Sequence, residues 1–241
     1  MRPPASEKVY RLVDFIDLLR GLQGAGLEFA AIGGCAVGAY AERVSSIVLS
    51  GDLDLYASPD VLVEILRYMQ AHGGVVHKRP QPRNMPVAFV EWQGKVVDVL
   101  TDVLGMPEPD VAIQTAREFV FGDVSVLVAD PFLLLANKLA VHRDKDLPHI
   151  EVLLRFITEE VVAEFQDADK PRDRIAPAKR LLRITGQRYL EPELALRLIP
   201  LARDPVDWRF LAHASPDVQP VLDRAPVDLV PELREIAARP G

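Results

Sequence analysis

Apolar residues recur at helical spacing near the start of the chain and then give way to short runs that are typical of strands. Residues 7 to 23 place apolar side chains three and four positions apart, which predicts an amphipathic helix. The apolar run 27 to 32 stops at Gly33-Gly34, which predicts a buried strand that ends in a tight turn. Residues 35 to 43 again have the helical pattern. The chain therefore opens with a predicted helix, strand and helix.

Alternating polar and apolar residues dominate the next part of the chain. In residues 51 to 56 this alternation predicts a strand with Asp52 and Asp54 on one face. Pro59 begins a predicted helix that runs to about Ala71. Further strands are predicted at residues 75 to 78, 87 to 92, 96 to 101 and near 124 to 128, with Gln93-Gly94 as a hairpin turn.

The pattern becomes helical in the last part of the chain. Asp130 as cap and Pro131 as first residue predict a helix that runs to about Arg143. Nearly every later segment has helical periodicity and is interrupted by prolines. We therefore predict an α/β (α+β) fold, with a mixed central sheet flanked by helices over residues 1–148 and a helical C-terminal domain over 149–241.

The composition is that of a globular protein. The 241 residues are 49% hydrophobic and 26% charged, and no apolar run approaches the ~20 residues needed to cross a bilayer. The N-terminus lacks the apolar segment of a signal peptide, so we expect a cytoplasmic protein without a membrane span. The single cysteine, Cys35, argues against a disulfide or a structural zinc site, and we expect it to be a small buried residue.

The charge limits the kinds of partner that the protein can bind. A net charge of -7 disfavours broad nucleic-acid binding that ignores sequence, because such binding depends on Lys and Arg. Local basic stretches exist, for example around Lys78, Arg79 and Arg83, and they are also typical of solvated faces.

Three aspartates stand in predicted strands. Asp52 and Asp54 are two residues apart, so they project from one face and could share a divalent cation. Such a pair alone is also typical of a strand end that faces solvent. Asp98 lies among aliphatic residues in the stretch 96 to 100, where an ionised carboxylate is costly unless it is paired or metal-bound. We therefore predict a metal site made of these three side chains.

Gly33-Gly34 lies where a predicted strand meets a predicted helix. Glycines let the backbone approach a triphosphate closely, and the start of a helix offers free N–H groups and a positive dipole end. A Gly-Gly pair alone is also typical of a simple turn. Together with the aspartates, however, the order of elements predicts phosphates on one side and metal ligands opposite.

Several segments resemble the nucleotidyltransferase superfamily, which includes DNA polymerase β, the aminoglycoside and lincosamide nucleotidyltransferases, and the AbiEii-type toxins of toxin–antitoxin systems. The resemblance covers roughly residues 27 to 155. It is carried by Ile32-Gly33-Gly34-Cys35-Ala36-Val37, Arg43 with Ser45 or Ser46, Gly51-Asp52-Leu53-Asp54-Leu55, Val97-Asp98-Val99, Asp130 to Ala140, and Arg143-Asp144-Lys145-Asp146. The last two segments look like the Lys-bearing helix and the Arg-x-Lys-Asp segment of the toxin-like branch.

The resemblance implies a role for each predicted site residue. Asp52 and Asp54 would bind Mg²⁺ or Mn²⁺ that grips the phosphates of an NTP such as ATP. Asp98 would complete a second metal site or take the proton from the acceptor hydroxyl. Gly33 and Gly34 would hold the β- and γ-phosphates by their backbone N–H groups.

The resemblance also implies that Lys138 and Arg43 offset the phosphate charge. For Lys138 the residues leave an alternative, because a lysine late in a helix is favourable at the negative end of the dipole. The implied reaction moves an NMP to an acceptor hydroxyl and releases pyrophosphate.

Three functions remain open at this point. The chain could be a toxin-like enzyme that acts on RNA, such as a tRNA end, or on protein, with an antitoxin as its partner. It could modify a small hydroxylated compound such as an aminoglycoside or a lincosamide. It could also be a catalytically silent module that senses a nucleotide or binds a protein.

Overall fold

The computed structural model describes residues 8–80, 87–141 and 143–167. The chain divides into two compact units, Met1–Leu154 and Arg155–Gly241. The boundary at residue 148 and the helical nature of the C-terminal domain stay predictions, because most of that domain lies outside the described residues. In the described part of the chain, no helix is long and apolar enough to cross a membrane.

Helices and strands alternate along the described residues. In chain order the elements are η1 (Leu12–Phe15), α1 (Ile16–Gly24), β1 (Ala30–Ile32), α2 (Gly33–Arg43), β2 (Asp52–Tyr56), α3 (Pro59–Ala71), β3 (Val75–Lys78), β4 (Val87–Trp92), β5 (Lys95–Leu100), α4 (Pro109–Gln114), β6 (Arg117–Phe121), β7 (Val124–Val128), α5 (Pro131–Val141), η2 (Asp144–Asp146) and α6 (Leu147–Asp167).

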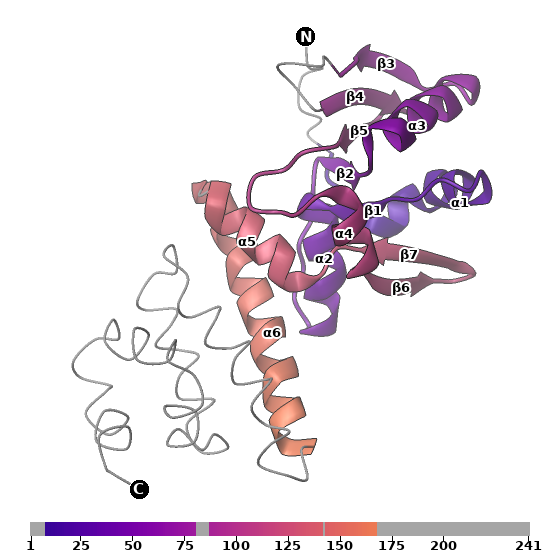
Figure 1. Ribbon diagram of the computed structural model, residues 1–241. Helices are drawn as coiled ribbons and strands as arrows, with labels where there is room; N and C mark the ends of the chain where they lie inside the picture. Colours follow the sequence, from indigo (N-terminus) through magenta and orange to yellow (C-terminus); the bar gives the residue numbers. More distant parts are fainter. Residues whose placement is uncertain (1–7, 81–86, 142, 168–241) are drawn as a thin grey trace, which may run out of the picture. The chain divides into compact units, whose positions relative to one another are not determined.

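The strands form one mixed sheet of seven strands, in the order β3-β4-β5-β2-β1-β7-β6. Figure 1 shows this order from β3 at the top to β6 at the bottom. Strand β2 is parallel to β5 and β1 is parallel to β7, whereas the other neighbours are antiparallel. Helices α1, α2 and α3 pack against the sheet. The predicted mixed α/β fold class is therefore confirmed.

The alternation in β2 separates a core face from a polar face. Leu53 and Leu55 are fully buried, and Asp52 and Asp54 project from the opposite face and are half-buried. The same alternation in the neighbouring strands buries Ala88, Val90, Val97 and Val99. Burial of this apolar face is the main favourable term that holds the sheet together.

Local signals placed two elements at the predicted residues. Helix α3 begins at Pro59, and the Ser58 hydroxyl accepts a hydrogen bond from the Val61 backbone N–H at 3.4 Å. The hairpin between β4 and β5 turns at Gln93 and Gly94, whose φ angles are +50° and +74°. Positive φ at both central residues is typical of a type I′ hairpin turn, so the predicted hairpin is confirmed.

Several boundaries differ from the prediction. A 3₁₀ turn from Leu12 precedes the first helix, and β1 begins at Ala30, later than the predicted strand start at Leu27. Gly33 and Gly34 form the first turn of α2 and do not lie before it. Helix α4 and strand β6 were not predicted, since one has only six residues and the other is an edge strand with an exposed Val120.

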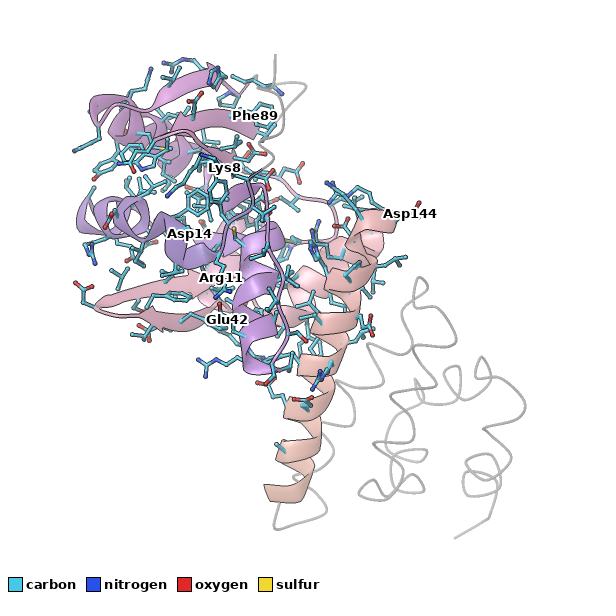
Figure 2. The ribbon with its side chains drawn as sticks, turned by 180° about the vertical axis from the view of Figure 1, so that it is seen from behind. Lys8, Arg11, Asp14, Glu42, Phe89 and Asp144 are labelled. Atoms are coloured by element: carbon cyan, nitrogen blue, oxygen red, sulfur yellow. The ribbon has the colours of Figure 1, made fainter. Side chains whose placement is uncertain are left out.

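The segment before η1 fixes the loop that leads into β2. Tyr10 and Ser50 form an isolated antiparallel bridge with backbone hydrogen bonds of 2.7 and 3.0 Å. Figure 2 shows Arg11 beside Glu42 of α2, and their side chains are 3.9 Å apart. The bridge anchors Ser50, which stands two residues before Asp52.

Candidate metal and phosphate site

Asp52, Asp54 and Asp98 meet on the polar face of the sheet. The parallel register of β2 and β5 places Asp54 directly opposite Asp98, and Asp52 opposite Val96. One carboxylate oxygen from each aspartate lies within 4.8 Å of the other two. Asp98 is 5% exposed and the other two are half-buried. The structure therefore brings the three predicted metal ligands together.

The three carboxylates fit a hard divalent cation. Like charges this close repel one another, and partial burial strengthens the repulsion because less water screens it. Oxygen donors are the ligands that Mg²⁺, Mn²⁺ and Ca²⁺ prefer, and Mg²⁺ is commonly held by one or two carboxylates with further oxygens from water or phosphate. The donor set therefore suits a cation that a nucleotide also coordinates.

Two neighbours position Asp52. The Ser50 hydroxyl donates to Asp52 Oδ1 at 3.0 Å, and the Cys35 thiol lies 3.2 Å from the Asp52 carbonyl oxygen. Burial raises the pKa of Cys35, and the charges of Asp54 and Asp52 raise it further. The thiol is therefore neutral, which agrees with the expectation that Cys35 is a small buried residue and makes it unsuited to act as a nucleophile.

The first turn of α2 lies against Asp54. Gly33 has a φ of +68°, and a Cβ at this position would lie 1.8 Å from Asp54 Oδ2. A Cβ on Gly34 would lie 2.5 Å from the Ser50 hydroxyl oxygen. The first N–H groups of a helix have no partner within the helix, and they attract anions. The two glycines thus allow an anion-binding backbone to approach the carboxylates closely.

An ion cluster, formed by the buried Lys138 and Asp146 with the exposed Arg143, stands at the junction of α5 and η2. Lys138 Nζ donates to Asp146 Oδ1 at 3.1 Å, and Arg143 donates to both carboxylate oxygens at 2.6 and 3.2 Å. Lys138 is 4% exposed and Asp146 is 1% exposed. Burial would raise the pKa of Asp146, but the hydrogen bond from Arg143 and the charge of Lys138 outweigh it and lower that pKa.

His149 lies between this ion cluster and the glycine turn, that is, Gly33 and Gly34 at the start of α2. Its Nδ1 lies 3.6 Å from Asp146 Oδ1, and its Cε1 lies 3.7 Å from the position of a Cβ on Gly34. Burial lowers the pKa of His149, and the charge of Lys138 lowers it further, so the imidazole is neutral at neutral pH. No role was predicted for His149. The signal that could have indicated one is its i+3 spacing from Asp146 at the start of α6.

Arg43 is a predicted phosphate ligand that the structure places at the end of α2 opposite Gly33. It is the last residue of α2, is exposed, and its guanidinium lies over the Phe119 ring at 5.3 Å from the centroid. The eleven residues of α2 span about 15 Å, and Gly33 occupies the opposite end of the helix.

No family model matches this chain, and no curated protein matches it. Among solved structures, the lincosamide antibiotic adenylyltransferase LnuA, lincomycin-bound, is 10% identical with a TM-score of 0.48 and covers 61% of this chain and 98% of its own. ANT(2″)-Ia in complex with adenylyl-2″-tobramycin is 14% identical with a TM-score of 0.44, and the match covers 68% of this chain and 94% of ANT(2″)-Ia. An antigenic nucleotidyltransferase-like protein from Paracoccidioides brasiliensis is 13% identical with a TM-score of 0.36, and the match covers 93% of this chain and all of that protein. Similarity at this level does not define a family.

The close approach of Gly33 to Asp54 predicts that only glycine fits at this position. Gly33→Ala should lower the free energy of unfolding by at least about 2 kcal/mol, because the added methyl group meets the carboxylate and the backbone is strained. Gly24→Ala is the control, since a Cβ there meets nothing within 4 Å. Urea unfolding of both variants measures the difference. Equal stability of the two would show that position 33 accepts a side chain.

The ion cluster predicts a large loss of stability when its carboxylate is removed. Asp146→Asn should lower the free energy of unfolding by about 3–5 kcal/mol at neutral pH, because Lys138 stays buried without its charge partner. The exposed neighbour Asp144 is the control, and Asp144→Asn should change stability by less than about 0.5 kcal/mol.

The pH dependence of this loss has a defined sign. Since folding lowers the pKa of Asp146 below its ordinary value of 3.8, the carboxylate stabilises the fold fully above that value and loses its effect as the pH falls through the folded pKa. Urea unfolding at several pH values should therefore show the difference between wild type and Asp146→Asn shrinking in acid. A difference that grows on acidification would contradict this assignment.

Proposed function

We propose that this chain is a metal-dependent nucleotidyltransferase, which moves an NMP from an NTP to the hydroxyl group of an acceptor. The observation that carries the proposal is the convergence of Asp52, Asp54 and Asp98 to within 4.8 Å, beside the glycine turn at Gly33. Phosphoryl transfer requires mainly that the protein position the groups and stabilise negative charge, and this arrangement supplies parts for both.

The carboxylates would hold Mg²⁺ or Mn²⁺. When bound, the cation would offset the charge of the NTP phosphates and of the reacting phosphoryl group. Asp52 is oriented by the Ser50 hydroxyl, and Asp54 is confined by the backbone of Gly33. These contacts limit the movement of two of the three side chains, so the ligand set is preorganised for metal binding.

The first turn of α2 would bind the β- and γ-phosphates through backbone N–H groups at Gly33 and Gly34. Lys138 and Arg143 contribute two positive charges and Asp146 one negative charge, so the ion cluster carries a net positive charge. His149 lies between that cluster and Gly34. Lys138 is buried and paired, and it would therefore act through this net charge, without a direct contact to phosphate. We propose no role for Arg43.

The reaction would proceed by direct displacement at phosphorus. The acceptor hydroxyl oxygen forms a bond to the α-phosphorus while the bond from that phosphorus to the bridging oxygen breaks. Pyrophosphate leaves with the electron pair, and the hydroxyl proton passes to a carboxylate. Asp98 is the proposed proton acceptor, because it lies on β5, the strand on the far side of β2 from the glycine turn.

Within this class we favour the toxin-like branch, with ATP as the first nucleotide to test and an antitoxin as the expected partner. The support is the resemblance of Lys138 and the Arg143 to Asp146 segment to that branch, together with the direct contacts that join these residues. The acceptor would then be RNA or protein.

The proposed function predicts metal-dependent nucleotide binding at the aspartates. Calorimetry with each NTP should show binding that requires Mg²⁺, and Asp52→Asn/Asp54→Asn should weaken it by more than about 100-fold. The loss of affinity should be that large because removing a residue that only hydrogen-bonds to a metal ligand already lowers metal affinity by about 10–100-fold. Asp60→Asn, an exposed aspartate at the start of α3, is the control and should bind as the wild type does. Undiminished Mg²⁺-dependent binding by the double variant would contradict the proposed site.

A further inference from the structure

The polar face of the sheet carries one row of residues that extends beyond the carboxylates. Across neighbouring strands Ile32 pairs with Asp54, Asp54 with Asp98, Asp98 with Phe89, and Phe89 with Lys78. Residues that lie directly opposite each other on paired strands point to the same face, with Cβ atoms about 4.5–5.5 Å apart in antiparallel pairs. The Phe89 side chain is therefore the immediate neighbour of Asp98 on this face.

The order of this row gives the site a direction. At one end, Ile32 leads into the glycine turn at Gly33, where the proposed function places the phosphates that leave as pyrophosphate. In phosphoryl transfer the attacking and leaving oxygens lie roughly in line on opposite sides of the phosphorus. The acceptor hydroxyl must then approach from the side of Asp98, over β5 and β4. This step rests on the proposed function.

Phe89 and Lys78 give that side a specific chemistry. Phe89 is half-buried, and Lys78 Nζ lies 4.8 Å from the centroid of its ring. Figure 2 labels Phe89 on the sheet. Arg79 follows Lys78 and is exposed. Glu91, on the same strand face as Phe89, lies 3.1 Å from His77 Nε2. An aromatic ring with an adjacent cation therefore stands next to the proposed proton acceptor.

We propose that Phe89 and Lys78 form an acceptor platform for the terminal nucleotide of a single-stranded nucleic acid. The base stacks on Phe89, a phosphate contacts Lys78, and the ribose hydroxyl reaches Asp98. Stacking on an aromatic side chain with a basic residue beside the strand is how proteins bind single strands without reading their sequence. Stacking of a base on the Phe89 ring is stronger than the cation–π contact of a partly exposed ammonium group. The base therefore displaces the Lys78 ammonium from the ring, and Lys78 turns to the phosphate.

The charge of the protein agrees with recognition of a chain end. A net charge of -7 disfavours a long electrostatic contact with nucleic acid, whereas one base and one phosphate require only one stacking residue and one cation. A cationic acceptor such as an aminoglycoside would meet Lys78 as a like charge at this platform, which disfavours that class of acceptor.

The test measures acceptor and nucleotide binding separately on the full-length protein. The acceptor probe is a fluorescent single-stranded oligoribonucleotide with a free 3′ hydroxyl, titrated by anisotropy in Mg²⁺ with a non-hydrolysable ATP analogue. The variants are Phe89→Leu and Lys78→Met. Phe121→Leu on edge strand β6 and Arg67→Gln on α3, whose side chain is 69% exposed, are the matched controls. Calorimetry of ATP with Mg²⁺ on each variant reports whether the nucleotide site is intact.

Phe89→Leu should weaken oligoribonucleotide binding about tenfold, and Lys78→Met should weaken it and lower its dependence on salt by about one counterion. ATP affinity should stay unchanged in both variants, and the controls should bind RNA as the wild type does. Wild-type protein that binds ATP but no oligoribonucleotide would overturn the acceptor platform and leave the proposed function standing. RNA binding that neither Phe89→Leu nor Lys78→Met alters would also overturn the acceptor platform and leave the proposed function standing.

Two further outcomes separate the remaining explanations. Saturable binding of tobramycin that Phe89→Leu abolishes, without RNA binding, would assign the platform to a cationic small compound and overturn the nucleic-acid acceptor. Wild-type protein that binds no NTP in Mg²⁺ would overturn the proposed function itself, and with it the direction of the row that leads to the platform.

Discussion

The in-register pairing of two parallel strands, β2 and β5, is the constraint on which the rest of the site depends. This pairing places Asp54 directly opposite Asp98 although 43 residues separate them along the chain. The buried leucines of β2 and the valines of β5 hold the register, because a slip of one residue would move the carboxylates into the core and the leucines to the polar face. The apolar face of the sheet thus determines the geometry of the polar one.

Charged groups of both signs lie near the first turn of α2. The aspartates concentrate negative charge on the sheet, whereas Lys138 and Arg143 exceed the charge of Asp146 in the ion cluster next to His149. An NTP bound with a divalent cation carries both signs and is complementary to such a site. Gly33 lies against the Asp54 side chain and begins α2, the helix whose first N–H groups would bind the phosphates in the proposed function.

Local pattern was enough to predict much of the sheet and the three aspartates, because a period of two determines which side chains share a face of a strand. It could not show that β2 and β5 are neighbours, since strand pairing is a tertiary contact. The contacts of Lys138 and His149 were missed for the same reason. Arg43 was associated with the phosphates through the resemblance, and the length of α2 places it at the far end of the helix from Gly33. Edge strand β6 lacked a strong signal because two of its five residues are exposed and only one is buried.

The most direct test of the metal site is the anomalous diffraction of crystals grown with Mn²⁺ and a non-hydrolysable ATP analogue. We expect an anomalous peak within coordination distance of Asp52, Asp54 and Asp98, with the β- and γ-phosphates against the first turn of α2. Nucleotide bound elsewhere on the protein, or Mn²⁺ bound by residues other than these aspartates, would contradict the proposed site.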